Sequence, residues 1–456
     1  MRFPFSWWQT LWVLLFMSGF VFRARTQADI NEDPVDAWAL FRIGLVLMVA
    51  LVLFLRICLR RTRWPSTLFS GVIGVFVLYP LISLISTAWS VRPPWTLYKS
   101  LEFLTDVFLL AVIVATLRTA RAYAKLVNWT WILLGLLVAS AWVGAIVDPA
   151  DALFSDPTIR IWALPARLVG VIPVVACNEL SAISAVLALV ALCRLFVDPE
   201  AQNKKGWYRL LLVAAVLTLL ITQTRGAYAA FLIGLFLLFI LTRRYRFAAV
   251  VGISSALVGS ALLLFTNFGK AAENFLLRGQ SVDQASGISG RGEIWQDSFS
   301  KILEHPWLGY GGFAGARFAV FSQNSIGASS LNSYIDSALN IGLWGPVILF
   351  IVVFAVGWSL LRSIDGSELS RVDSSLALEM FMAFIIILVS SFESGDLVTH
   401  PPLFFLTILG AAEILRFERK SLRMEILKDD IQGQESFIAT RWNESSTSTR
   451  PLTNLE

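Results

Sequence analysis

Long uninterrupted apolar runs recur from one end of the chain to the other. A helix needs about 20 mostly apolar residues to cross about 30 Å of hydrocarbon. About twelve runs meet or approach that length: Phe5–Phe22, Ala37–Leu59, Ser66–Trp89, Leu101–Leu117, Trp129–Val147, Leu180–Val197, Tyr208–Thr222, Gly226–Leu241, Phe247–Phe265, Ile341–Leu361, Leu376–Phe392 and Leu403–Leu415. Because apolar and polar positions do not alternate within them, the runs exclude a β-barrel. The pattern predicts an all-α polytopic membrane protein with about twelve transmembrane helices.

Composition supports this prediction. Hydrophobic residues make up 56% of the 456 residues and charged residues only 15%. Soluble domains carry about 25% charged residues, and a soluble domain of this length cannot hide so much apolar surface. A soluble enzyme, a disordered chain, a coiled coil and a disulfide-stapled module are therefore excluded. The net charge of +5 comes from bases in short loops between the runs, so we expect no nucleic-acid partner.

The distribution of basic residues predicts the orientation of the chain. Arginines crowd the loops at residues 56–63 and 243–246, whereas the alternate loops, such as residues 29–36, are poorer in bases and often acidic. Cytoplasmic loops carry the excess of Lys and Arg in membrane proteins. Both termini are therefore expected in the cytoplasm.

The runs divide the chain into four parts. Residues 1–265 hold the first nine spans, residues 266–340 form one long outer loop with short amphipathic helices, and residues 341–415 hold the last three spans. Residues 416–456 form a cytoplasmic tail, which we expect to start as a membrane-surface helix and to be disordered from Asn443. Loops as long as the outer one are usually functional, and bases on that side suit an anionic ligand.

The outer loop contains a stretch that predicts a helix beginning near Arg291 and ending before Pro306. Its apolar residues share one helical face: Ile294, Trp295, Phe299, Ile302 and Leu303. An arginine in the first turn of a helix, beside free backbone N–H groups, can bind phosphate oxygens. The alternative is an ordinary solvated helix on which Arg291 pairs with Glu293 or Asp297.

Three further outer segments carry polar residues near the ends of spans. The first has Arg167 followed by Asn178, and the second has Arg225 followed by Gly226. Arg225 could equally be a side chain that reaches the lipid headgroups. The third segment runs from Asn332 to Asp336 and suits a short helix leading into the tenth span. The three outer arginines could converge on one diphosphate.

The order of these four segments resembles the O-antigen ligase and O-antigen polymerase family of bacterial envelope enzymes. Each segment matches a family motif in this sequence. The matching residues are Arg167, Gly170 and Asn178; Thr224, Arg225 and Gly226; Gly290, Arg291, Ile294, Trp295, Pro306, Gly309 and Gly311; and Asn332, Ser333 and Tyr334. The resemblance covers residues 167–346 well and the flanking spans only by topology.

The resemblance implies a glycosyltransferase of the bacterial inner membrane that takes a glycan from a polyprenyl diphosphate carrier and joins it to an acceptor hydroxyl in the periplasm. It implies no metal and no cofactor, since fixed arginines stabilise the departing diphosphate. Arg225 and Arg291 are then the catalytic clamp. The residues implied to bind substrate are Arg167, Asn178, Glu293, Asn332, Ser333 and Tyr334. Implied partners are the lipid-linked donor, a glycan or lipid acceptor, the bilayer, and chain-length or flippase components of the export machinery.

One position departs from the family pattern. Ligase-like members carry a His before the Asn, and that position here is Leu331, which cannot take a proton. The two histidines of the chain, His305 and His400, lie elsewhere; the first suits a packing role and the second is a remote candidate. Asp336, or else Glu293, is the carboxylate that we expect to act as base.

This departure favours a polymerase of exopolysaccharide or O-antigen repeat units. The alternative within the same chemistry is a ligase that transfers the finished chain to lipid A-core or another acceptor. A polysaccharide transporter or flippase, and a non-catalytic scaffold, are alternatives of other classes. A transporter would place polar residues at the membrane midplane, whereas the charges within the expected spans are few, with Arg42 and Glu102 near span ends.

Overall fold

The computed structural model describes residues 6–22, 36–59, 61–62, 64–154, 166–197, 204–246, 249–250, 252–254, 257, 260, 291–320, 329–364, 371–399 and 403–447. Helices account for nearly all of the regular structure in these ranges. One two-stranded antiparallel ribbon joins β1 (Leu153–Phe154) to β2 (Arg167–Leu168). The all-α class expected from the sequence is confirmed, with this short ribbon as an addition.

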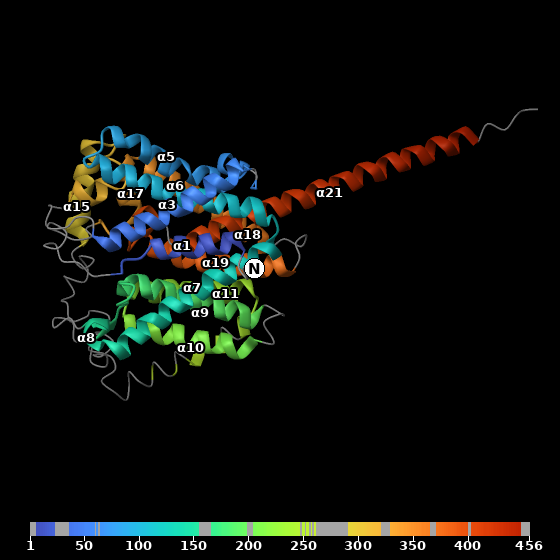
Figure 1. Cartoon of the computed structure of the whole chain (residues 1–456). Coiled ribbons are helices and arrows are strands. Elements are labelled where there is room, and N and C mark those ends of the chain that lie inside the picture. Colours follow the sequence, from blue (N-terminus) through green and yellow to red (C-terminus); the bar gives the residue numbers. More distant parts are fainter. Residues whose placement is uncertain are drawn as a thin grey trace, which may run out of the picture.

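The helices run roughly parallel to one another in a bundle (Figure 1). In chain order, their bounds are α1 (Trp7–Ser18), α3 (Ala37–Cys58), η1 (Ser66–Phe69), α4 (Gly71–Phe76), α5 (Leu78–Ile85), η2 (Ser86–Ala88), α6 (Pro93–Leu117), α7 (Ala120–Val147), α8 (Pro149–Ala152), α9 (Cys177–Phe196), α10 (Lys205–Thr222), α11 (Arg225–Leu241), α15 (Arg291–Glu304), α16 (Gly315–Phe318), α17 (Ser333–Ile341), α18 (Trp344–Ile364), α19 (Arg371–Ser390), α20 (Asp396–Thr399) and α21 (Leu403–Thr447).

Within the described ranges, eight helices are long and apolar enough to cross a membrane. They are α3, the α4–η2 segment, α6, α7, α9, α10, α18 and the 373–390 part of α19, while α11 is apolar but shorter. The expected span Phe247–Phe265 lies mostly outside the described residues. The expected span Phe5–Phe22 is helical over only 12 residues. The expected span Ser66–Trp89 is divided into short α and 3-10 helices.

The core of the bundle lies around α9, α19 and the first part of α21. α9 packs against α10, α11 and α19, and α21 packs against α6, α7, α18 and α19. Consecutive residues of α9 from Leu180 to Ala191 are buried on all sides. Helices α3 and α10 instead expose apolar side chains such as Leu47, Phe54 and Leu217. A helix that is hydrophobic all round and faces outward is typical of a lipid-facing helix.

Charged residues lie deeper in the helices than the sequence suggested. Helix α6 begins at Pro93, so Glu102, which is 2% exposed, is not near its end. Its carboxylate pairs with Lys99. In α19 the buried Glu379 accepts hydrogen bonds from Arg194 at 2.8 and 2.9 Å. These two carboxylates are thus held in ion pairs, which is what buried charges require.

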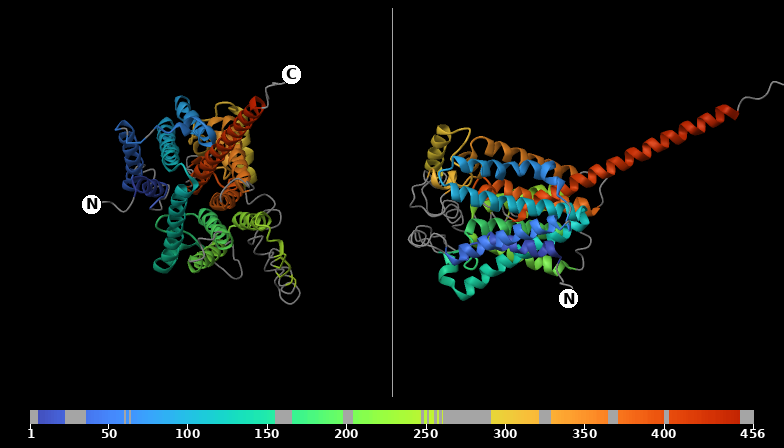
Figure 2. Two further views of the ribbon diagram at one scale, coloured as in Figure 1. Left: turned by 90° about the vertical axis from the view of Figure 1, so that its right-hand side faces the viewer. Right: turned by 45° about the horizontal axis from the view of Figure 1, so that its top comes forward.

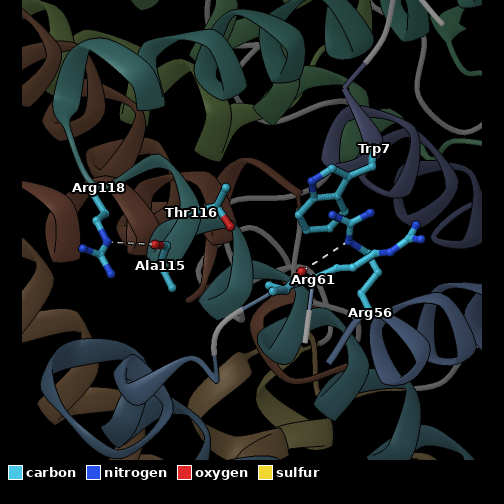
Figure 3. Close-up of a pocket in the computed structure, with 7 residues that line it drawn as sticks. Trp7, Arg56, Arg61, Ala115, Thr116 and Arg118 are labelled. Carbon is cyan, nitrogen blue, oxygen red and sulfur yellow. Dashed lines mark hydrogen bonds between the residues drawn. The ribbon is translucent and has the colours of Figure 1, made fainter. Parts of the chain in front are cut away.

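The two ends of the bundle differ. Helices α8, α15 and α17 gather at one end, and α21 leaves the bundle at the other (Figures 1 and 2). Helix α21 continues without a break to Thr447, so residues 443–447, which we expected to be disordered, are helical. At the α21 end, Ala120 N–H donates to Glu418 at 2.8 Å. A cavity of about 360 Å³ is lined by Arg56, Arg61 and Arg118, among others. Figure 3 shows these three side chains.

Candidate functional site

A turn that joins α19 to α20 connects the separate motifs of the α15–α17 end. This connecting turn comprises residues 391–395, Ser-Phe-Glu-Ser-Gly. One side of it contacts the start of α11, and the other contacts the start of α17. Segments that lie more than 100 residues apart in the sequence, at Arg225 and at Asn332, therefore meet at the same turn.

The start of α11 presents Arg225 beside a carboxylate. Arg225 is the first residue of the helix, where backbone N–H groups have no partner within the helix. The next residue is Gly226, and a Cβ atom built there would collide with the carboxylate of Glu393. Glycine at this position thus allows the Glu393 side chain to lie directly against the helix start. The result is an arginine and a carboxylate at one helix N-terminus.

The segment that carries Arg167 and Asn178 lies against the same helix start. The Thr224 hydroxyl donates to Asn178 Oδ1 at 3.2 Å. The Gln223 side-chain amide donates to the carbonyl of Ala166 at 3.2 Å. One terminal nitrogen of the half-buried Arg167 guanidinium is shielded from solvent and has no hydrogen-bond partner in the described part of the chain. The first two arginine motifs therefore adjoin each other.

The Asn332-Ser333-Tyr334 motif begins α17, and the contacts of its side chains stabilise that helix start. Asn332 caps the helix, because its Oδ1 accepts from Tyr334 N–H at 3.0 Å and from Ile335 N–H at 3.2 Å. Ser333 Oγ donates to the carbonyl of Ser394 at 2.8 Å. The Tyr334 ring stacks on Phe350 with centroids 4.6 Å apart. Each of these three side chains, which we expected to bind substrate, thus has a partner within the protein.

Asp336 is fully buried one turn further along α17. Its Oδ1 accepts from Ser330 N–H at 2.8 Å, and a Cβ atom at Gly395 would collide with its carboxylate. These contacts join the segment before α17 to the connecting turn. Leu331 lies between them with φ at 56°, in the left-handed region that a leucine rarely adopts. The position that carries the family's His is thus held in an unusual backbone conformation.

Helix α15 contacts the segment before α17 through its tryptophan. The Trp295 indole N–H donates to the carbonyl of Ser330 at 2.9 Å, one helical turn after Arg291. The predicted helix and its end before Pro306 are confirmed. The predicted buried face is wrong in part, because Phe299 and Leu303 are 53% and 78% exposed. Ser298 of the same helix is instead fully buried, and its hydroxyl donates to the carbonyl of Ile294 at 2.7 Å.

Of the two histidines, His305 directly follows the last residue of α15. His305 is exposed, and its ring meets Tyr310 edge to face at 4.9 Å, as expected of a packing residue. His400 lies outside the described residues, and so does the side chain of Glu293. Lys301 donates to the Glu304 carboxylate at 2.9 Å, and the Tyr310 hydroxyl donates to it at 2.8 Å. These two hydrogen bonds lower the pKa of the Glu304 carboxyl. The loop after α15 is thereby tied to its last turn.

Sequence reasoning missed Glu393. It directly follows Phe392, the last residue of the eleventh expected span, at the end of the span that was expected to face outward. An acidic residue next to an outer-facing span end was a usable signal, but its partner Gly226 could not be read from the sequence. In the described ranges, no group of three His, Cys, Asp or Glu side chains is arranged to hold a metal ion.

The fold and these contacts define a polytopic helical membrane protein whose polar motifs meet at one end of the bundle. Residues 210–351 match the family model described as O-antigen ligase, which confirms the resemblance over this segment. The matched segment includes Arg225, Arg291 and the start of α17. No curated protein matches the chain. The family match supports glycan transfer in envelope polysaccharide biosynthesis and a bacterial membrane location.

Proposed function

We propose that the protein transfers a glycan from a polyprenyl diphosphate carrier to an acceptor hydroxyl at the periplasmic face of the inner membrane. The single observation that carries the proposal is the meeting of the Arg225, Arg167 and α17 motifs around the connecting turn. Helix α15, which begins at Arg291, adjoins them through the Trp295 bond to Ser330. In this proposal both termini lie in the cytoplasm, and the α15–α17 end faces the periplasm.

The chemistry needs a site for negative charge. The acceptor oxygen attacks the anomeric carbon of the donor, the bond from that carbon to the phosphate oxygen breaks, and the polyprenyl diphosphate leaves with both electrons. Arg225 and Arg291 stabilise the charge that develops on the diphosphate, and the guanidinium of each can bind two phosphate oxygens at once. Arg167 supplies a further N–H donor, since its buried terminal nitrogen has no partner in the described ranges.

The acceptor hydroxyl must also lose a proton, and we assign the base to Glu393. Of the two carboxylates expected from the sequence, Asp336 is bound to Ser330 N–H and is fully buried, and the side chain of Glu293 lies outside the described residues. Within the described residues, no hydrogen bond or ion pair engages the Glu393 carboxylate, which lies against Gly226, the second residue of α11. A base must come within hydrogen-bond reach of its proton, and a partly exposed, unengaged carboxylate can do so.

Polymerisation of repeat units is the outcome that we propose, because Leu331 departs from the ligase-like members. The test is the size of the carrier-linked glycans that accumulate when the gene is deleted in its own host. Single repeat units on the carrier would support a polymerase. The same glycans as in the undeleted host would contradict transfer altogether.

A ligase is the second candidate, and the description of the matching family favours it. Full-length chains that remain on the carrier after deletion would support this candidate and contradict the polymerase. The donor chemistry, the arginines and the proposed base are the same in both. The acceptor alone distinguishes them: another carrier-linked glycan for a polymerase, and lipid A-core for a ligase.

A further inference from the structure

A second feature of interest lies at the opposite end of the bundle, in a groove between α4, α18 and the part of α21 that follows the bundle. The groove has a cavity volume of about 530 Å³. Five cationic side chains line it: Arg362, Arg416, Arg419, Lys420 and Arg423. From Trp344, where α18 meets α17, to Arg362 the helix rises about 27 Å at 1.5 Å per residue, close to the thickness of the hydrocarbon. The groove therefore lies at the other membrane surface from the candidate site.

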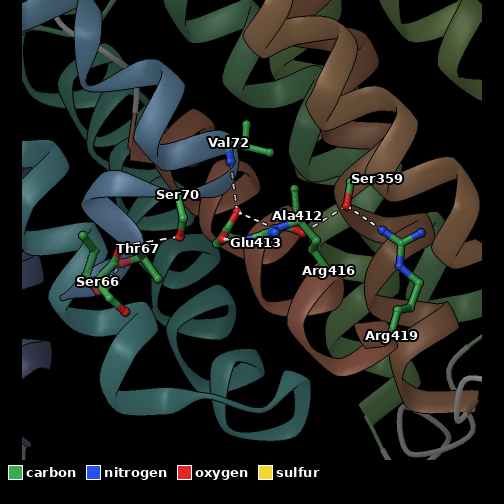
Figure 4. Close-up of polar contacts among 10 residues, drawn as sticks. Ser66, Thr67, Ser70, Val72, Ser359, Ala412, Glu413, Arg416 and Arg419 are labelled. Carbon is green, nitrogen blue, oxygen red and sulfur yellow. Dashed lines mark hydrogen bonds and ion pairs between the residues drawn. The ribbon is translucent and has the colours of Figure 1, made fainter. Parts of the chain in front are cut away.

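The buried carboxylate of Glu413 binds groups from two helices at the inner wall of the groove. Glu413 is fully buried and accepts from Val72 N–H at 3.0 Å. It also pairs with Arg416, so one of the five cations is neutralised (Figure 4). A Cβ atom at Gly71 would collide with this carboxylate and with Arg416, so glycine is needed where α4 begins. The ion pair joins α4 to α21 and forms one side of the groove.

The other four cations have no acidic partner in the part of the chain that the structure describes. Arg419 is fixed by a bond from its Nη2 to Ser359 Oγ at 2.9 Å, as Figure 4 shows. The Arg362 guanidinium lies over the Trp358 ring at 4.5 Å. Burial, together with repulsion from Arg362, Arg423 and Arg416, lowers the pKa of Arg419. The positive charges of Arg362 and Arg419 are thus held in place, and no acidic side chain in the described ranges neutralises them.

The wall of the groove toward the bilayer is apolar. Val72 and Val75 of α4 line it, with Phe354 and Trp358 of α18. Phe354 is 71% exposed and stacks on Trp358 with ring centroids 6.2 Å apart. A ligand that fills this groove needs an anionic group at the rim and a hydrocarbon part along the wall. A free phosphate ion matches the rim alone.

We propose that this groove binds an anionic phospholipid of the cytoplasmic leaflet. The lipid phosphate lies among Arg362, Arg419 and Arg423, and an acyl chain lies along Phe354 and Trp358. Basic residues near the membrane surface attract anionic lipids in general, but here a fixed cavity and an adjoining apolar wall define one position. The bound lipid joins α18 to the emerging part of α21. The choice of the cytoplasmic leaflet rests on the orientation proposed above, whereas lipid binding itself does not depend on the glycan-transfer activity.

The test uses the purified full chain in neutral detergent, with retained lipids counted by native mass spectrometry. The probes are phosphatidylglycerol and phosphatidylcholine. The variant combines Arg362→Gln, Arg419→Gln and Arg423→Gln, and leaves Arg416 because it neutralises the buried Glu413. The control combines Lys204→Gln, Lys205→Gln and Arg209→Gln, which removes the same charge from the start of α10.

We expect the wild type to retain phosphatidylglycerol in preference to phosphatidylcholine. The groove variant should bind phosphatidylglycerol roughly tenfold more weakly or worse, and the control should match the wild type. Equal binding by the groove variant and the wild type would overturn the proposal, and so would an equal loss in the control. Displacement of the lipid by excess inorganic phosphate would overturn the lipid assignment in favour of a free anion.

A second measurement needs no variant and so does not depend on whether the altered protein folds. Wild-type protein is labelled with a phosphatidylglycerol that carries a photoreactive group on its acyl chain, and the labelled peptides are identified. The proposal predicts label on residues 71–76 and 354–362. Label confined to other helices would overturn it.

Discussion

At the scale of single residues, the candidate site depends on close contacts between glycines and carboxylates. Gly226 accommodates Glu393, and Gly395 accommodates Asp336. Neither pair is near in sequence, so no spacing rule could predict it. Arg225 and Arg291, in contrast, stand out in the sequence, because bases are unusual on the side of a membrane protein that is expected to face outward. Their role in transfer stays a prediction.

Replacing Gly226 with alanine should displace the Glu393 carboxylate, because a Cβ atom has no room there. We expect glycan transfer to fall and the free energy of unfolding to drop by about 1–3 kcal/mol, as for other overpacked sites. The matched control is Gly135→Ala, at a helix position with open space around it, which should be neutral or slightly stabilising. Equal behaviour of the two variants in activity and in thermal unfolding would contradict the close packing.

The assignment of the base makes a separate prediction. Glu393→Gln should abolish most transfer and leave the melting temperature unchanged, since no hydrogen bond or ion pair of this carboxylate is present in the described ranges. General bases typically contribute about 10²–10⁴-fold to a rate. Asp336→Asn, which can still accept from Ser330, should retain activity. Loss of product in Asp336→Asn, with normal product formation in Glu393→Gln, would make Asp336 the base.

At the scale of elements, the family motif around α17 works mainly as a helix start. Asn332 accepts two backbone N–H groups that otherwise have no partner. The family resemblance implied that Asn332, Ser333 and Tyr334 bind substrate, and a motif match does not distinguish a capping side chain from a ligand-binding one. The short helix itself was predictable from its apolar face, and it is confirmed over Ser333–Ile341.

Asn332→Ala should destabilise the protein by about 1–2 kcal/mol through loss of the cap. Asn332→Asp keeps an acceptor at the same position and should restore most of that stability. The measurement is thermal unfolding of the purified variants, with glycan transfer measured alongside. Loss of transfer in Asn332→Ala without any change in stability would contradict the capping role and favour direct contact with substrate.

Hydropathy predicted most helices but misplaced several bounds. Helix α6 begins eight residues before the expected Leu101, because Pro93 suits the first turn of a helix and the polar residues that follow are tolerated there. The expected span Ser66–Trp89 is divided where Gly71 adopts a positive φ of 68° to admit Glu413. Average hydropathy registers neither a cap nor a close contact with another helix, so it could not predict these features.

At the scale of the whole molecule, the two ends of the bundle hold different polar groups. The α15–α17 end brings together motifs from four parts of the sequence, and the other end carries the basic groove and the emerging α21. Loop charges predicted that the ends would differ. They could not predict that the connecting turn after α19 joins α11 to α17, because tertiary contacts of a loop depend on how its flanking helices pack.

The central claim is that arginines at the α15–α17 end drive transfer from a polyprenyl diphosphate donor. Its most direct test supplies the purified full chain with a polyprenyl diphosphate-linked glycan in the presence of a metal chelator, and measures the released polyprenyl diphosphate and the extended glycan. We predict product with the wild type and with the control Arg209→Ala, and a loss of about 10²-fold or more in Arg225→Ala and in Arg291→Ala. Product formation in both arginine variants at the wild-type rate would contradict the account.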